Sequence, residues 1–193
     1  MIYFTSDTHF NDPRFELMDR PFSSTKQMNK YILRKHRKVL KQTTENDTFY
    51  HLGDFAVLQD SLTEYEKSFK DYFYKVRARK ILILGNYEKL LPEWYRNYFD
   101  EVKEFKNISS DLVAVHKPED IKKIGYTDKT FSLVGHIHGA WKIQRKMINV
   151  GVDVHHFNII DYEYIWEKMK SIKTYYDINA FAGEMDINYN SKL

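Results

Sequence analysis

The chain contains no cysteine among its 193 residues, so disulfide bonds and thiolate metal sites are excluded. No apolar run approaches the ~20 residues that a membrane-spanning helix needs. The amino terminus, Met-Ile-Tyr, also lacks the charged and apolar regions of a signal peptide. We therefore expect a soluble, cytoplasmic protein that has no membrane partner.

The chain also lacks a large excess of either charge, because 30 Lys and Arg residues against 27 Asp and Glu residues leave a net charge of only +3. That balance does not indicate a general nucleic-acid-binding surface, although local basic clusters leave nucleic acid open as a ligand. One cluster, Arg34 to Lys38, falls in a predicted amphipathic helix from Thr25 to Gln42, where we interpret it as a solvated face.

Glycine and proline are few, with 7 and 4 residues, and no linker or internal repeat divides the chain. An apolar content of 42% is enough for one substantial core. We predict a single domain over residues 1–193, in which 161–193 form a C-terminal helix and tail. That helix could dock on the body of the protein or form a homo-oligomer contact.

Five short apolar runs, rich in β-branched and aromatic residues, predict strands that are buried on both faces. Each run ends abruptly at a polar cluster. In open α/β sheets, ligands bind outside the carboxyl ends of the strands. The runs are Ile2–Thr5, Thr48–Leu52, Lys80–Leu84, Leu112–Val115 and Phe131–Val134, and an edge strand is predicted at Glu101–Phe105.

The clusters that follow these strands are Asp7-x-His9, Gly53-Asp54, Gly85-Asn86, His116 and Gly135-His136-x-His138. Taken alone, an Asp after a strand is usually a helix cap, and a buried His is usually a hydrogen-bonded core residue. Together they would concentrate buried polar groups that a fold tolerates only when they are paired or bind metal. The set therefore indicates a metal site.

The strongest single cluster is His136-x-His138. In an extended segment, residues i and i+2 point to the same side, so we expect both imidazoles to face one cavity. Gly135 and Gly139 would let the backbone turn closely around that cavity.

The order of these clusters resembles the calcineurin-like metallophosphoesterase superfamily, from Met1 to about Asp153. The resemblance is closest to a group of small bacterial and phage phosphoesterases, and it implies an α/β fold of two mixed β-sheets packed as a sandwich and flanked by helices. Flanking segments that carry the resemblance are Tyr3–Phe10, Asp19–Phe22, Tyr50–Phe55 and Asn149–Asp153.

The resemblance implies two divalent metal ions that activate water for the hydrolysis of a phosphate ester. Ligands that mix carboxylate, carboxamide and imidazole suit Mn, Fe, Zn or Ni better than Mg or Ca, and we favour manganese. The implied ligands are Asp7, His9, Asp54 and His138 for one ion, and Asp54, Asn86, His116 and His136 for the other.

The sequence departs from the family pattern after Asn86. Most members place there a His that is thought to protonate the leaving group, whereas this chain has Tyr87. A phenol with a pKa near 10 is a weak acid, so we favour phosphodiester or nucleotide-type substrates over simple monoesters. We expect Asp54, Asn86 and Tyr87 to be catalytic.

The substrate rim also departs from the pattern, because Phe10-Asn11-Asp12 stands where the closest group usually has Phe-Gly-His. We expect Arg20, Tyr87 and Asn11 to contact a phosphorylated small molecule or nucleotide, with the Arg20 guanidinium clamping a phosphate. Two alternatives stay open: a broad phosphomonoesterase, and a catalytically weak metal-binding scaffold.

Overall fold

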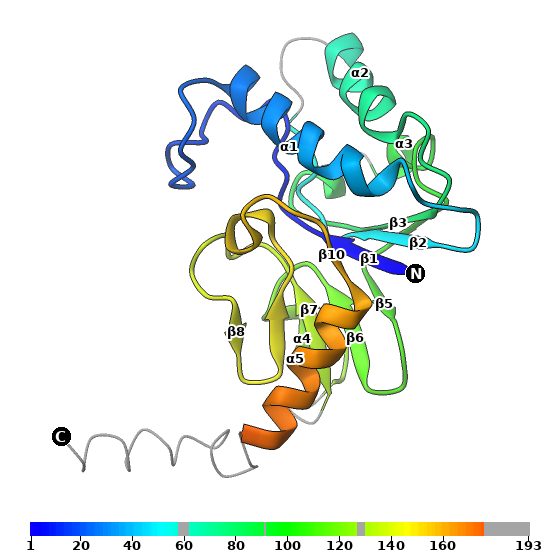
Figure 1. Cartoon of the computed structure of the whole chain (residues 1–193), viewed down its shortest axis with the longest axis vertical. Coiled ribbons are helices and arrows are strands. Elements are labelled where there is room, and N and C mark those ends of the chain that lie inside the picture. The colour runs from blue at the N-terminus through cyan, green and yellow to red at the C-terminus, as the bar shows by residue number, and fades with distance from the viewer. Residues whose placement is uncertain (58–61, 91, 127–129, 176–193) are drawn as a thin grey trace, which may run out of the picture.

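The computed structural model describes residues 1–57, 62–90, 92–126 and 130–175, which form two five-stranded mixed sheets (Figure 1). In the first sheet the strand order is β10-β1-β2-β3-β4, and only β10 runs antiparallel to its neighbour. The strands are β1 (Ile2–Thr5), β2 (Thr48–His51), β3 (Arg79–Ile83), β4 (Glu101–Lys103) and β10 (Ile160–Asp161).

The second sheet has the order β5-β6-β7-β9-β8, with β6, β7 and β9 parallel and the two edge strands antiparallel to them. Its strands are β5 (Phe105–Asn107), β6 (Leu112–Val115), β7 (Phe131–Val134), β8 (Ile143–Gln144) and β9 (Met147–Asn149). The predicted α/β fold with two packed mixed sheets is thus confirmed.

Helices cover the sheets on the outside (Figure 1). Helix α1 begins after Ser24, whose hydroxyl accepts a hydrogen bond from the Gln27 amide at 3.2 Å and so caps the first turn. The remaining helices are α2 (Leu62–Phe73), η1 (Glu88–Leu90), α3 (Pro92–Tyr95), α4 (Asp120–Lys123), η2 (Val152–His155) and α5 (Tyr162–Tyr175), after α1 at Thr25–Leu40. Among the described residues, no helix is both long and apolar enough to cross a bilayer.

Strand side chains alternate between two buried layers, which explains the continuous apolar runs in the sequence. Phe49 and Leu82 pack with the residues of α1 and α2, whereas Tyr50 and Ile81 pack against the second sheet and α5. Both faces of the first sheet are therefore buried, and only the ends of its strands can present polar groups to a ligand.

Most predicted elements are confirmed, but the single edge strand at Glu101–Phe105 is wrong. The chain leaves the first sheet after Lys103, and Phe105 pairs with Val115 in the second sheet. The run therefore supplies an edge strand to each sheet. The helix predicted from residue 161 is α5, while residues 176–193 of the predicted tail lie outside the described residues.

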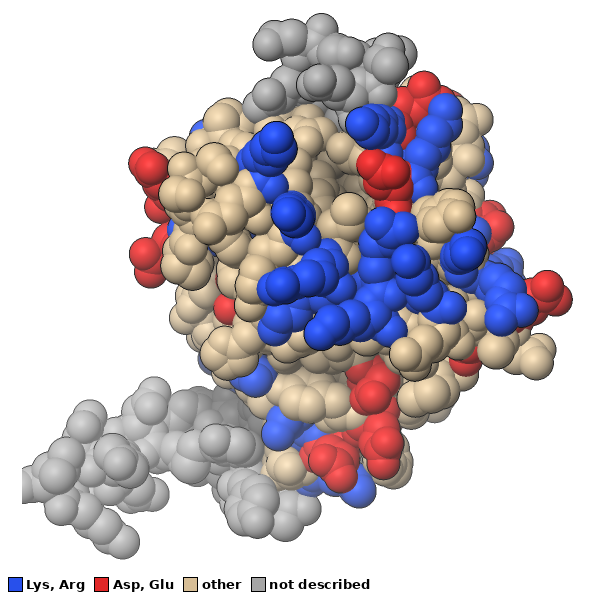
Figure 2. All heavy atoms as spheres, turned by 45° about the horizontal axis from the view of Figure 1, so that its top comes forward, with Lys and Arg blue, Asp and Glu red and all other residues tan. Residues whose placement is uncertain are grey.

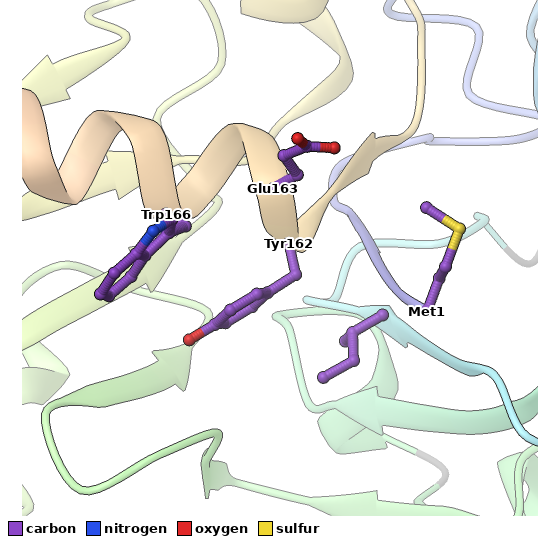
Figure 3. A pocket seen from close by; sticks show the side chains of 5 residues that line it. Met1, Tyr162, Glu163 and Trp166 are labelled. Atoms are coloured by element: carbon purple, nitrogen blue, oxygen red, sulfur yellow. The ribbon is translucent and has the colours of Figure 1, made fainter.

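A hollow of about 570 Å³ lies where the start of β1 meets the first turns of α5. Tyr162 and Trp166 project from α5 on one side of it, and Met1 lies across from them (Figure 3). It is at the amino end of β1, opposite the strand ends that carry the polar clusters.

Candidate metal centre

The five polar clusters meet at one edge of the two-sheet sandwich. The loop after β1 runs beside the loop after β2, because the amides of Asp7 and His9 donate to the carbonyls of Gly53 and Asp54, both at 3.0 Å. The two sheets are joined there as well, since the His136 amide lies 3.0 Å from both carboxylate oxygens of Asp7. Loops from opposite sheets are thereby held in contact.

Six of the seven candidate ligands fall into two groups whose ligand atoms lie within 4.8 Å of one another. The two groups match the division of these six residues that the resemblance implies. Asn86, the seventh candidate, joins the second group, because its side-chain nitrogen lies 3.2 Å from Nδ1 of His136. The groups are Asp7, His9 and His138, and Asp54, His116 and His136.

The Asp54 carboxylate lies between the two groups. Its Oδ2 atom is 3.7 Å from Nε2 of His9 and 3.4 Å from Nε2 of His116. Its other oxygen, Oδ1, accepts a hydrogen bond from the Asn86 amide at 2.6 Å. One oxygen is thus fixed by the backbone, and the other faces ligand atoms of both groups.

Carboxylates outside the two groups fix the orientation of two imidazoles. His9 Nδ1 donates to Asp12 at 2.9 Å, and His138 Nδ1 donates to Asp153 at 2.8 Å. In both rings this arrangement leaves the Nε2 lone pair to face the cavity. Such carboxylate–histidine pairs are the usual support of a histidine that binds a metal.

In His116 the Nε2 atom also faces the cavity, but here Nδ1 donates to a backbone carbonyl, that of Leu52, at 2.6 Å. Nε2 of His116 and Nε2 of His9 are buried and have no hydrogen-bond partner among the described residues. A buried nitrogen without a partner costs free energy that a bound cation would recover. These orphaned atoms, together with the neighbouring carboxylates, fit divalent metal ions.

The electrostatics of the site favour positive charge. Burial lowers the pKa of His116, but the neighbouring carboxylates of Asp54 and Asp7 outweigh burial and raise that pKa to about 9. The pKa of the Asp54 carboxyl is lowered in turn, since burial raises it less than His116 and His9 lower it. A cation at this position is therefore stabilised by the fixed carboxylates.

Many candidate ligands have backbone dihedral angles in the left-handed region of the Ramachandran plot. Five of the seven candidate ligands have positive φ angles, between 46° and 72°. Since non-glycine residues rarely adopt this conformation, the surrounding structure must hold them in it. His136 and His138 are both among the five, so the prediction of an extended segment is wrong: each imidazole reaches a different group through a left-handed turn. The five are Asp7, His9, Asp54, His136 and His138.

Close backbone contacts explain two of the glycines. Gly53 has a φ of +88°, and a Cβ there would lie 2.6 Å from Gly85 Cα. A Cβ on Gly135 would overlap the side chains of Ser6 and Asp7. Nothing lies within 4 Å of the corresponding position at Gly139, so the expectation that Gly139 serves a close turn is not supported.

Arg20, which the sequence predicts to be a substrate contact, is buried among protein partners in the structure. Its side chain is only 1% exposed, and Nε lies 2.7 Å from Asp153. The guanidinium also donates to the carbonyls of Asp7 and Thr8 and to the sulfur of Met28. All of its N–H groups are engaged inside the protein, so Arg20 stabilises the loop of Asp7 and Thr8 and the position of Asp153.

The two other predicted substrate contacts lie nearer the rim. Asn11 connects its loop to α1 and α2, because its side-chain amide donates to Ser68 and accepts from Asn29. The Tyr87 ring packs edge-on against His9, with centroids 5.4 Å apart, and its hydroxyl accepts a hydrogen bond from Arg14. Tyr87 is thus placed at the opening of the first group, while the Asn11 amide is occupied by protein partners.

Two further carboxylates were missed by sequence reasoning. Asp12 lies three residues after His9, a local spacing that could have marked it as a partner. Glu88 is fully buried and accepts hydrogen bonds from the backbone amides of Asp54, Phe55 and Gly85 at 2.7–2.9 Å. Burial and the charge of Asp54 raise its pKa to about 7. The one sequence signal for Glu88 is its position directly after Tyr87, where most members of the family have Asp or Glu.

Two other proteins are similar to this chain over most of its length. The chain is 26% identical over 188 residues to the uncharacterized protein MJ1445 of Methanocaldococcus jannaschii, covering 92% of this chain and 97% of that protein. It also resembles the crystal structure of AQ665, a protein of unknown function from Aquifex aeolicus. That match has a TM-score of 0.62 and 26% identity, and it covers 86% of this chain and 98% of the other.

The family model for calcineurin-like phosphoesterases matches residues 1–183, nearly the whole chain. The match includes every loop that contributes a candidate metal ligand. On the evidence of this match, the chain is a member of the calcineurin-like phosphoesterase family.

Proposed function

We propose that this protein is a dinuclear metal-dependent phosphoesterase whose preferred substrates are phosphodiesters or nucleotide-type esters. The observation that carries the proposal is the pair of ligand groups on either side of Asp54, with Asp54 Oδ2 facing a bare histidine nitrogen in each. Family membership supports metal-dependent hydrolysis of phosphate esters in general.

The first ion would be held by Asp7, His9, Asp54 and His138, and the second by Asp54, Asn86, His116 and His136. When bound, two such cations neutralise phosphate oxygens and lower the pKa of a water molecule that attacks phosphorus. Manganese is our preferred metal, because the mixed nitrogen and oxygen donors suit it better than the all-oxygen shells of magnesium or calcium.

Residues around the ligands would position the imidazoles. Asp12 and Asp153 accept hydrogen bonds from the Nδ1 atoms of His9 and His138, which orients each ring with its Nε2 atom aimed inward. Arg20 in turn orients Asp153 through its guanidinium. Catalysis would then depend on a rigid set of side chains rather than on a movable acid or base.

Tyr87 would contact the substrate at the opening of the site. Its ring borders His9, and the cationic Arg14 lies against both its hydroxyl and its ring face. A phenol hydroxyl can donate a hydrogen bond to a phosphate oxygen but protonates a leaving group poorly. This favours esters whose leaving group departs without help, such as aryl diesters, pyrophosphates and cyclic phosphodiesters.

The test is hydrolysis of bis-p-nitrophenyl phosphate and p-nitrophenyl phosphate by metal-stripped protein, with and without added manganese. Asp54→Ala removes the carboxylate between the two groups, and Asp71→Ala, on the exposed face of α2, serves as the matched control. We expect manganese-dependent turnover that is lost in Asp54→Ala and kept in Asp71→Ala, with the diester hydrolysed faster.

The alternatives give different results. A much faster monoester would overturn the diester preference and indicate a broad phosphomonoesterase. Two bound metals without turnover of either ester, unchanged by Tyr87→His, would point to a metal-binding scaffold instead.

A further inference from the structure

Helix α1 carries an uninterrupted run of positive charge. No acidic residue occurs between Asp19 and Glu45, whereas the segment from Thr25 through Lys41 contains seven Lys and Arg residues. Because the whole chain has a net charge of only +3, the remaining residues carry more acidic than basic groups. The positive charge is thus concentrated on one helix. Figure 2, in which the top of Figure 1 with α1 is turned toward the viewer, shows a broad band of Lys and Arg on that face.

Four of these side chains form a row, here called the basic ladder: Lys26, Lys30, Arg34 and Lys38. All four are exposed, and their spacing of four residues places them on one stripe of the helix. None of them pairs with an acidic side chain in the part of the chain that the structure describes. By contrast, Lys70 of α2 pairs with Glu66 at 2.9 Å, one turn away.

The basic ladder lowers the stability of its own helix. Like charges at i and i+4 destabilise a helix by about 0.2–0.5 kcal/mol for each pair. The stability of the fold therefore does not explain four aligned cations without acidic neighbours. Binding of an anionic partner, which would neutralise them, explains the arrangement.

Aromatic rings lie among the cations. Arg34 packs over the Tyr31 ring at 5.3 Å. Tyr74, which is 54% exposed, is approached by Arg37 at 5.6 Å and by Lys75 at 5.3 Å. Cations interleaved with exposed aromatic rings are typical of surfaces that bind single-stranded nucleic acids, where the rings stack on bases.

A lipid surface fits less well, because an interfacial helix needs apolar side chains beside its cations. The large apolar side chains that are exposed among the described residues all lie outside α1: Met1, Leu17, Tyr74, Leu90, Phe105 and Trp166.

The basic ladder starts beside the metal centre. Asn29, next to Lys30, accepts from the Asn11 amide at 3.1 Å and donates to the Asn11 side chain at 2.7 Å. Asn11 in turn lies two residues after His9. From Asn29 to its last residue, Leu40, α1 extends over about 17 Å at 1.5 Å for each residue.

We propose that α1 binds the phosphate backbone of a single-stranded nucleic acid, with Lys26, Lys30, Arg34 and Lys38 contacting phosphates and Tyr74 stacking on a base. This binding site is separate from the ligand groups, so the proposal goes beyond phosphoester hydrolysis and does not depend on it. A strand lying on the ladder would have one end beside the metal centre.

The test is binding of a fluorescein-labelled 12-nucleotide single-stranded RNA, followed by fluorescence anisotropy in EDTA over a range of salt concentrations. Chelation separates binding from hydrolysis, so a failure of the proposed enzyme activity leaves this test intact. The ladder variant replaces Lys26, Lys30, Arg34 and Lys38 by Gln, which keeps helix propensity. The control variant replaces four lysines on other elements by Gln and changes the net charge equally: Lys103, Lys122, Lys168 and Lys170.

We expect the ladder variant to bind at least tenfold more weakly at low salt. The slope of log affinity against log salt should fall by about 3 units, since each phosphate contact to a single strand contributes about 0.7. Tyr74→Ala should weaken binding further, and the ladder variant should hydrolyse bis-p-nitrophenyl phosphate at the wild-type rate if that activity is present.

Three results would overturn the proposal. The first is no measurable RNA binding by the wild-type protein at 50 mM salt. The second is an equal loss of affinity in the control variant, which would mean that only net charge matters. The third is ladder-dependent binding to phosphatidylserine vesicles in place of RNA, which would assign the surface to a membrane.

Discussion

Replacing Arg20 by Leu distinguishes the role that its burial implies from the role that its sequence position suggested. In the structure the guanidinium pairs with Asp153 at 2.7 Å, and both side chains are nearly inaccessible, at 1% and 7% exposed. Leucine would leave the Asp153 carboxylate without its buried cation. It would also remove the donors that satisfy the carbonyls of Asp7 and Thr8.

Removing one partner of a buried ion pair costs about 3–5 kcal/mol of unfolding free energy. That is a large part of the 5–15 kcal/mol that holds a typical domain together. For a domain of this size, each kcal/mol shifts the melting temperature by roughly 2–4 °C. We therefore expect Arg20→Leu to melt about 6–20 °C below the wild-type protein.

The assay is thermal unfolding and urea unfolding followed by circular dichroism, in EDTA so that bound metal does not contribute. Arg34→Leu, at an exposed position of α1, is the control and should change stability by no more than about 0.5 kcal/mol. A double variant in which Asp153 is also Leu should lose less than the sum of the two single variants. Wild-type stability of Arg20→Leu with a raised KM for the ester would refute the structural reasoning and restore Arg20 as a substrate contact.

Three further predictions address other parts of the structure. Asp12→Asn should weaken manganese binding about 10–100-fold in a competition titration with a fluorescent chelator, because His9 loses its carboxylate partner, and unchanged affinity would contradict this. His36 is fully buried, and burial lowers its folded pKa from 6.5 to about 3. Since the unfolded chain takes up the proton first, stability should fall as pH drops below 6.5, by about 2 kcal/mol at pH 5, and His36→Gln should remove that part of the slope in urea unfolding. Gly135→Ala should cost about 1–3 kcal/mol because its Cβ has no room, whereas Gly139→Ala should be nearly neutral, and equal melting temperatures would argue against the close approach at Gly135.

The sequence alone was sufficient for the five strands that lead into the ligand loops. A strand buried on both faces needs a continuous apolar run, and the polar residues at its end stand out against that run. Both signals are local, so the bounds of β1, β6 and β7 agree with the predicted runs. The family pattern added the order of the clusters, and the structure brings six of the seven candidate ligands into two groups.

The partners of individual side chains could not be predicted in this way. Arg20 and Asp153 are 133 residues apart, and only the closure of the two sheets places one beside the other. Glu88 looks like an ordinary helix residue until its carboxylate is seen to accept three backbone amides. The left-handed residue His136 likewise contacts a distant segment, because its amide lies 3.0 Å from the carboxylate of Asp7, in the loop after β1 of the other sheet.

The sequence by itself therefore determined which residues end the strands and what chemistry their donor atoms can perform. Residue type and strand periodicity are encoded locally and survive in any tertiary context. Only the tertiary structure decided which side chains face the cavity and which hold those side chains by hydrogen bonds. It also decided that α1 contacts the loop that follows His9. Those properties arise from contacts between distant segments, and such contacts exist only after the two sheets pack together.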